Sequence, residues 1–124
     1  MKVNSTQHGG GLSAIAELPQ EAFAVLALDA GNKPIGPAKI VTLGLLDRNQ
    51  VHPREVFSDA LKDRAASIIV AHNHPSGNPN PSSEDMVLTK RLVRAGELLG
   101  IKVLDHLILS PAGKLTSLRA KGHM

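Results

Sequence analysis

Apolar residues recur along the chain with two different spacings, which separate expected strands from expected helices. Residues 21–29 form an apolar run that predicts a strand. The turn-forming residues 30–33 follow, so a second strand over residues 35–45 is expected to return as a hairpin. Residues 67–71 form a short run that is apolar after Ser67, which is typical of a central strand covered on both faces.

Two segments carry helical spacing instead. One helix is expected to begin at His52 and Pro53, because proline is tolerated in a first turn. Its apolar stripe consists of Val56, Phe57, Ala60 and Leu61. The other helix opens within residues 82–85 and ends at Gly100, a residue that favours helix termination. Its stripe consists of Leu88, Leu92, Ala95 and Leu99.

The end of the chain returns to strand-like patterns. Residues 101–109 and 114–118 predict two strands joined by a turn over residues 110–113. The resulting order, β-β-α-β-α-β-β, predicts an α/β fold in which a mixed β-sheet is sandwiched by helices. We expect one domain over residues 14–120, with a flexible leader over residues 1–13 and an unstructured tail over residues 121–124.

Composition narrows the possible chemistry. The chain has 124 residues, of which 42% are hydrophobic, and this suits one globular domain. It has no cysteine, which excludes disulfides, thiolate zinc sites and cysteine nucleophiles. A metal ion must therefore be held by histidine, carboxylate or water. No apolar run approaches the ~20 residues that span a bilayer, and no signal peptide opens the chain, so a cytoplasmic location is expected.

The charge balance permits a nucleic-acid partner without requiring one. The net charge is +3, and Lys90, Arg91 and Arg94 cluster on one predicted helix. A solvated helix face is the commoner explanation of such a cluster. Phe23 and Phe57 are the only aromatic residues of the Phe, Trp and Tyr class, so the chain offers no stacking platform for single-stranded bases.

The residues after the central strand carry the candidate chemistry. His72 and His74 are two residues apart, and in a strand such residues share a face, roughly 6.5 Å apart along the chain. Two imidazoles placed this way can converge on one metal ion. Asp85 follows a loop rich in proline and glycine and can supply a third ligand, and two histidines, a carboxylate and water form a known catalytic zinc set.

Two simpler explanations compete with the metal site. The histidines can be ordinary residues at a strand end, bonded to loop carbonyls. Ser82 and Asp85 also have the spacing of a capping box, in which the serine caps the helix and the aspartate bonds back to it. If Asp85 binds metal it is less free to cap, and Ser83 can then take over as the cap. Other metal motifs are absent: the chain has no H-E-x-x-H, and without cysteine it cannot form a zinc deaminase site.

The spacing of these residues resembles the JAMM metalloprotease motif: His72-x-His74, seven intervening residues, Ser82, two more residues and Asp85. The wider sequence, including residues 53–57, 71–77 and 105–106, resembles the C-terminal domain of the RadC family over about residues 20–119. The resemblance implies a JAMM/MPN-like, cytidine-deaminase-like architecture. The helix-hairpin-helix region that usually precedes this domain is missing, so we expect either a truncated form of a longer protein or a lone JAMM-like domain.

The resemblance also implies roles for individual residues. His72, His74 and Asp85 would hold Zn²⁺, Glu21 would be the general acid/base, and Ser82 would donate a hydrogen bond to the oxyanion. Glu17 and Glu55 compete with Glu21 for the first role. Candidate residues behind the ligands are Asp105 and His106, because ligating histidines are usually oriented by an outer partner.

Two functions from different classes follow. The first is a zinc-dependent metallopeptidase or isopeptidase that acts on a peptide or protein substrate. The second is a non-catalytic module associated with DNA repair, in which the metal site is structural or vestigial. The family name is tied to DNA repair, and a basic helix face would contact phosphates without reading sequence.

Overall fold

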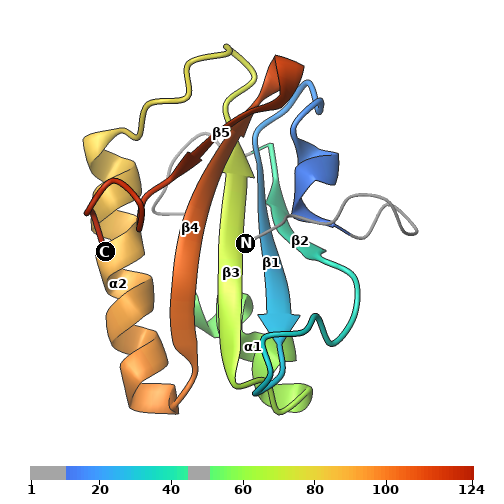
Figure 1. Cartoon of the computed structure of the whole chain (residues 1–124), viewed down its shortest axis with the longest axis vertical. Coiled ribbons are helices and arrows are strands. Elements are labelled where there is room, and N and C mark those ends of the chain that lie inside the picture. Colours follow the sequence, from blue (N-terminus) through green and yellow to red (C-terminus); the bar gives the residue numbers. More distant parts are fainter. Residues whose placement is uncertain (1–10, 45–50) are drawn as a thin grey trace.

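The computed structural model describes residues 11–44 and 51–124, and in them one five-stranded sheet carries the fold (Figure 1). The strand order is β2-β1-β3-β4-β5, in which β3 and β4 are parallel and the other neighbours are antiparallel. The sheet is therefore mixed, and the predicted α/β class is confirmed. The strands are β1 (Ala22–Leu28), β2 (Lys39–Leu43), β3 (Ser67–Asn73), β4 (Lys102–Ser110) and β5 (Lys114–Ser117).

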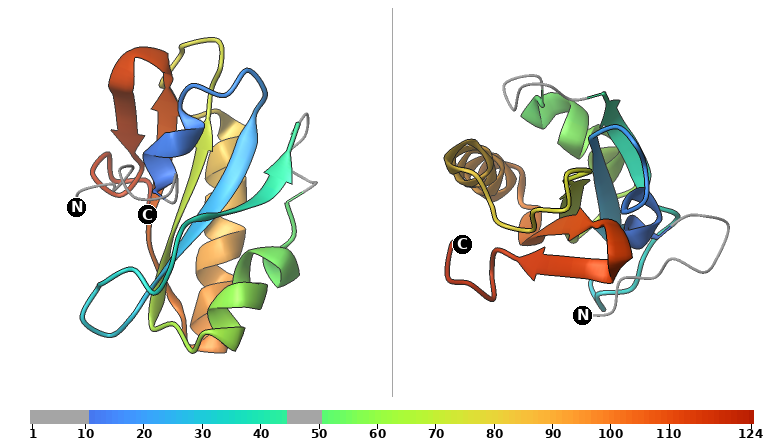
Figure 2. Two further views of the ribbon diagram at one scale, coloured as in Figure 1. Left: turned by 90° about the vertical axis from the view of Figure 1, so that its right-hand side faces the viewer. Right: turned by 90° about the horizontal axis from the view of Figure 1, so that it is seen from above.

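The two α-helices, α1 (Pro53–Lys62) and α2 (Ser83–Leu99), cover one face of the sheet (Figure 2). They share one hydrophobic cluster with Phe23 and Val25 of β1 and with Ile68 and Val70 of β3. The opposite face packs against the short 3₁₀ helix η1 (Leu12–Ile15), and a second one-turn segment, η3 (Pro111–Gly113), joins β4 to β5. The two layers over the sheet are thus unequal.

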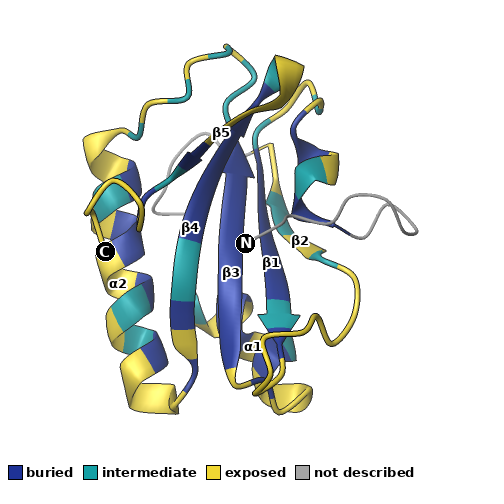
Figure 3. Cartoon of the chain, in the orientation of Figure 1, coloured by how far each residue is buried: buried dark blue, intermediate teal, exposed yellow. Residues whose placement is uncertain are grey.

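Strand β3 is buried along its whole length, as Figure 3 shows at the centre of the sheet. Successive side chains of a strand point to opposite faces, so Ile68 and Val70 contact the helices while Ile69 and Ala71 contact the layer of η1. Continuing this alternation puts His72 on the helix face and Asn73 on the other face. Burial on both faces explains why the strand is apolar until it reaches the histidine.

The predicted hairpin is confirmed, but its second strand is shorter than expected. Strands β1 and β2 pair antiparallel, and β2 begins only at Lys39. Pro34 makes an isolated bridge to Leu28, and Gly36 and Pro37 follow it. Proline lacks the N–H that a continuing ladder needs, which delays the strand. Residue 45, at the predicted end of this strand, lies outside the described residues.

The helix boundaries agree with the sequence, whereas the last member of each predicted stripe is wrong. Leu61 and Leu99 are 49% and 44% exposed. In α2 the buried face instead follows Asp85, Leu88, Thr89, Leu92 and Gly96. Two of these residues are polar, so a stripe drawn through apolar residues alone is rotated away from the true contact face.

The predicted leader and tail also need correction. Residues 1–10 lie outside the described part of the chain, but Leu12 and Ser13 belong to η1, and Leu12 is fully buried. At the other end, residues 121–124 are exposed, but Lys121 and Gly122 lie in a turn, and His123 N–H donates to the Leu118 carbonyl at 2.9 Å. Within the described residues, no helix is long and apolar enough to cross a membrane.

The connection from α2 to β4 depends on a close approach at Gly96. A Cβ atom on Gly96 would lie 2.2 Å from the Ile101 carbonyl oxygen and 3.3 Å from Phe57 Cζ. The first of these contacts is with backbone, which cannot move aside cheaply. Glycine is therefore required for α2 to pack this closely against the turn into β4.

We predict that Gly96→Ala lowers the free energy of unfolding by about 1–3 kcal/mol, the usual cost of overpacking a core. Thermal or urea unfolding measures this change. The matched control is Gly36→Ala, because a Cβ there meets nothing within 4 Å. That substitution should leave stability unchanged or raise it slightly, since alanine has less freedom than glycine in the unfolded chain. Equal effects of the two substitutions would contradict the packing argument.

Candidate metal centre

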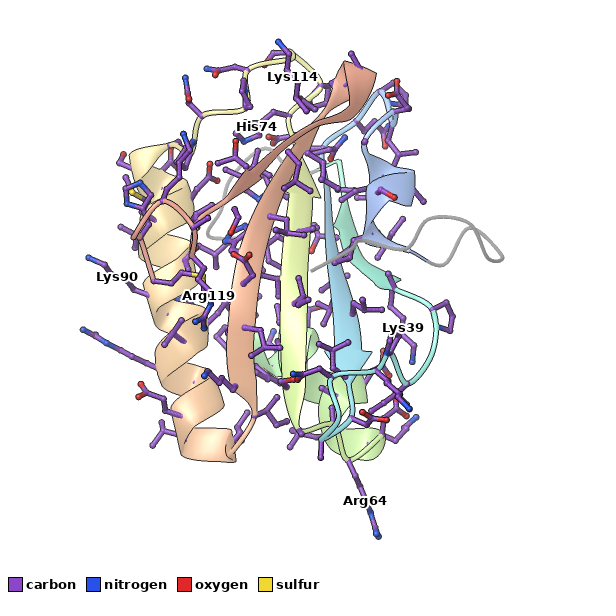
Figure 4. All side chains as sticks on the ribbon, in the orientation of Figure 1. Lys39, Arg64, His74, Lys90, Lys114 and Arg119 are labelled. Carbon is purple, nitrogen blue, oxygen red and sulfur yellow. The ribbon has the colours of Figure 1, made fainter. Side chains whose placement is uncertain are left out.

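The structure brings His72, His74 and Asp85 together at the end of β3. His72 and Asp85 are fully buried, and His74, which Figure 4 labels near the end of β3, is partly buried. The two Nε2 atoms are 2.9 Å apart, His72 Nε2 lies 3.2 Å from Asp85 Oδ1, and His74 Nε2 lies 3.5 Å from Asp85 Oδ2. One candidate ligand atom from each residue lies within 4.8 Å of the others. Among the described residues, this is the one such group found.

A chain of hydrogen bonds determines which nitrogen of His72 faces this centre. Thr89 Oγ donates its one proton to the Asp85 carbonyl oxygen at 2.8 Å, so it accepts from His106 Nδ1–H at 2.5 Å. The other nitrogen of a neutral His106, Nε2, then accepts from His72 Nδ1–H at 2.8 Å. His72 Nε2 is left with a lone pair directed at His74 and Asp85.

A hydrogen bond also determines which ring nitrogen of His74 carries its proton. Its Nδ1 lies 2.7 Å from the backbone carbonyl oxygen of Asn78, which can only accept, so Nδ1 carries the proton. In the neutral imidazole, its Nε2 therefore also presents a lone pair. Two ring nitrogens and one buried carboxylate face one another, and a bound cation, either a proton or a metal ion, would be stabilised among them.

The donor set fits zinc. Two atoms each about 2.0–2.1 Å from a tetrahedral Zn²⁺ are about 3.3–3.4 Å apart. The two Nε2 atoms are 2.9 Å apart, and His72 Nε2 is 3.2 Å from Asp85 Oδ1, which is close to that value. The 3.5 Å separation from His74 Nε2 is to the other carboxylate oxygen, Oδ2. Two imidazoles and one carboxylate leave a fourth position for water or substrate, which is the usual arrangement of a catalytic zinc site.

The capping box and the metal site occur together rather than excluding each other. Ser82 is the N-cap of α2: its Oγ accepts from Asp85 N–H at 3.0 Å, and Asp85 Oδ2 accepts from Ser82 N–H at 2.8 Å. Ser83 does not replace it. The cap occupies Asp85 Oδ2, whereas Oδ1 faces His72. It also uses a lone pair of the Ser82 hydroxyl, so the hydroxyl proton is not consumed by the cap.

Phe23 of β1 forms the apolar wall of the centre. Its ring stacks on His72, with centroids 6.2 Å apart and planes 10° apart, and it meets His106 edge-on at 5.8 Å. Sequence reasoning missed Phe23 and Thr89. Thr89 is four residues after Asp85, one helical turn on, and that spacing was a usable signal.

Of the two residues expected behind the ligands, His106 is in place and Asp105 is not. Asp105 neighbours His106 in β4, so its side chain points to the opposite face of the sheet. Its carboxylate accepts from Ser117 Oγ at 2.5 Å and from the backbone N–H groups of His106 and Arg119 at 2.7 and 3.1 Å. Asp105 therefore joins β4 to the end of β5.

Glu21 and Ser82 share one cavity with His74. Its volume is about 470 Å³, and the loop after β3 lines the rest of it, through Pro75, Ser76, Asn78, Asn80 and Pro81. The competing glutamates lie elsewhere. The carboxylate of Glu17 accepts from Ala112 N–H, and Glu55 lines a separate cavity between β2 and α1.

The basic cluster lies apart from the cavity. Lys90, Arg91 and Arg94 are exposed on α2, and Figure 4 shows Lys90 on the outer side of this helix. None of the three is among the residues that line the cavity described above.

Comparison with known proteins identifies the family that the sequence motifs resemble. Residues 7–123 match the family described as RadC-like JAB domain. The whole chain is similar to a UPF0758 protein of Methanospirillum hungatei, at 47% identity over 56% of that protein. A UPF0758 protein of Caldanaerobacter subterraneus is 51% identical over 86% of this chain and 45% of its own length, and one of Bacillus cereus is 50% identical over 86% and 47%. The chain thus spans about half the length of these curated relatives.

We predict that the protein binds about one zinc ion per chain, and that His74→Ala and Asp85→Ala sharply lower this stoichiometry because each removes a converging ligand. Elemental analysis of protein purified without chelator measures it. Lys90→Ala, on the exposed face of α2, is the control and should bind zinc normally. Unchanged zinc content in both ligand variants would contradict the metal site, and the capping box would then be the remaining explanation for Asp85.

We also predict that Thr89→Val weakens zinc binding by about 10- to 100-fold, the usual effect of losing the outer partner of a ligating histidine. Valine keeps the shape of threonine but cannot accept the hydrogen bond from His106 Nδ1–H. The tautomer of His106, and through it that of His72, is then no longer fixed. Thr89→Ser keeps the hydroxyl and should bind zinc nearly as well as the original protein. Competition with a chromophoric chelator compares the two, and equal weakening would argue against the hydrogen-bond chain.

Proposed function

The chain belongs to the RadC-like JAB domain family, and on that premise we propose that it is a zinc-dependent hydrolase that cleaves a peptide or isopeptide bond. One observation carries the proposal. The ring nitrogens of His72 and His74 converge with the Asp85 carboxylate, and His74 also lines a cavity together with Glu21 and Ser82. Because the chain spans about half of its relatives, this activity is proposed for the domain.

Zinc, when bound, supplies Lewis-acid chemistry, which makes water a better nucleophile near neutral pH and polarises a carbonyl group. The residues of the chain supply the rest. Glu21 takes a proton from the attacking water as its oxygen bonds to the carbonyl carbon. It returns that proton to the amide nitrogen as the C–N bond breaks. The Ser82 hydroxyl donates a hydrogen bond to the oxyanion of the tetrahedral intermediate.

The charge of the cavity favours an amide substrate over a phosphodiester. Among the described residues that line it there is no lysine or arginine, and the loop between His72 and Asp85 has none either. A transferring phosphate needs such a cation or a second metal about 3.5–4 Å from the first. The described residues supply ligands for one ion. A neutral carbonyl needs no such compensation.

Cleavage of a peptide or isopeptide library by the zinc-loaded protein tests the proposal. We predict that Glu21→Gln keeps zinc and stability but lowers the hydrolysis rate by at least about 10²-fold, because glutamine cannot accept the proton. Mass spectrometry of the products gives the rate and the bond cleaved. Glu55→Gln is the matched control, since Glu55 is exposed on α1, outside this cavity, and it should leave the rate unchanged.

The same preparation incubated with single- and double-stranded DNA tests the other function. Zinc-dependent nicking that disappears in His72→Ala, without peptide cleavage, would overturn the assignment. A DNA association constant whose logarithm falls linearly with the logarithm of the salt concentration would support a DNA-associated module instead. In that case Lys90→Ala and Arg94→Ala should weaken the binding. Full activity of Glu21→Gln would assign the base to another residue.

A further inference from the structure

Asn73, the residue between the two histidine ligands, bonds a segment of chain that is distant in sequence. It is fully buried, and its side chain lies on the face of β3 opposite His72. Its Oδ1 accepts from Ala22 N–H at 2.6 Å. Its Nδ2 donates to the carbonyl oxygens of Gln20 at 2.9 Å and Leu18 at 3.3 Å. The two shorter bonds reach the residues on either side of Glu21.

The Asn73 side chain extends the hydrogen bonding between β1 and β3 beyond their last backbone pair. The β1–β3 register ends at Phe23 opposite His72, and β3 goes on to bond β4, since His74 N–H donates to the Leu109 carbonyl at 2.8 Å. A carboxamide carries the same donor and acceptor as a peptide group. Asn73 therefore takes the place of one more backbone pair, at the point where the chain approaches the cavity.

The other side of Glu21 is held by the residue that follows β2. The Glu21 carbonyl oxygen accepts from Gly44 N–H at 2.7 Å. The backbone around Glu21 is thus bonded from both sides, by Gly44 just after β2 and by Asn73 of β3. The side chain of Glu21 lines the cavity that His74 and Ser82 share.

We propose that Asn73 is a positioning residue: it fixes the Gln20–Ala22 backbone so that Glu21 is held in the cavity that His74 also lines. The same residue thereby couples the ligand strand to the base strand, because it lies between His72 and His74. This inference rests on the proposed role of Glu21. Aspartate would lack the two donors, and serine or threonine would be too short to bond both sides, so asparagine suits the position.

The first test needs neither metal nor substrate. Amide hydrogen exchange by NMR should show the Ala22 N–H of Asn73→Ala exchanging about tenfold faster, because a buried hydrogen bond is lost and the segment opens locally. Asn73→Thr, which keeps nearly the same volume and suits a strand, should show the same change if the alanine variant folds poorly. Ser67→Ala is the matched control on β3, since Ser67 Oγ is buried without a partner among the described residues.

The second test separates positioning from general stability. In Asn73→Thr the zinc content and KM should hold while kcat falls about 10- to 100-fold, the effect of misplacing a catalytic group. In a Glu21→Gln background the same substitution should lower kcat no further, because the group it positions is already disabled.

The outcomes are distinct. Unchanged Ala22 exchange in both Asn73 variants overturns the inference, whatever the activity. Loss of zinc together with faster exchange also overturns it, because Asn73 would then act on the ligands rather than on Glu21. A further fall of kcat in the Glu21→Gln background does the same. Faster exchange in a protein that cleaves no amide leaves the anchoring role standing and counts against the proposed function alone.

Discussion

The structure depends on a central strand that is buried on both faces and hydrogen-bonded on both edges. Strand β3 pairs with β1 on one side and β4 on the other, and all seven of its residues are buried. An apolar strand held this way has its register fixed, because a shift by one residue would exchange the two faces. The consequence at its end is that His72 must face the helices while Asn73 faces the η1 layer.

The imidazoles and the threonine hydroxyl can be buried at this end because each has a partner. His72, His106 and Thr89 form a chain of hydrogen bonds within an apolar wall that includes Phe23. A half-satisfied network at this depth would destabilise the fold, whereas a satisfied one restricts each imidazole to a single tautomer and orientation. The ring nitrogens of His72 and His74 that face Asp85 mark the position at which a bound cation would be stabilised.

The cavity beside this centre combines residues from three elements. Glu21 precedes β1, His74 follows β3, and Ser82 caps α2. The capping box has two effects here. It satisfies the Asp85 N–H, one of the first-turn N–H groups that lack a partner within the helix, and it orients Asp85 so that Oδ1 points at His72. Stability and the proposed chemistry therefore depend on the same hydrogen bonds, which is why substitutions at Asp85 are expected to affect both.

Local patterns in the sequence determined the order of elements, both helix starts and the three candidate ligands. These features depend on short-range physics: two-residue alternation along a strand, helical periodicity, proline in a first turn, glycine at a helix end and the Ser82–Asp85 spacing. The role expected for Glu21 came from the family resemblance. Its presence in the cavity agrees with that expectation, and its catalytic role is still a prediction.

Only the tertiary structure decided which side chains meet across elements. His72 bonds His106, 34 residues away, Thr89 bonds His106, 17 residues away, and Asn73 bonds Ala22, 51 residues away. No local periodicity encodes such pairs, because they follow from strand register and from the rotation of α2 about its axis. The same reason explains the errors: Asp105 and His106 are adjacent in sequence yet face opposite sides of β4, and Leu12 is buried because η1 packs on a sheet that forms from residues far along the chain.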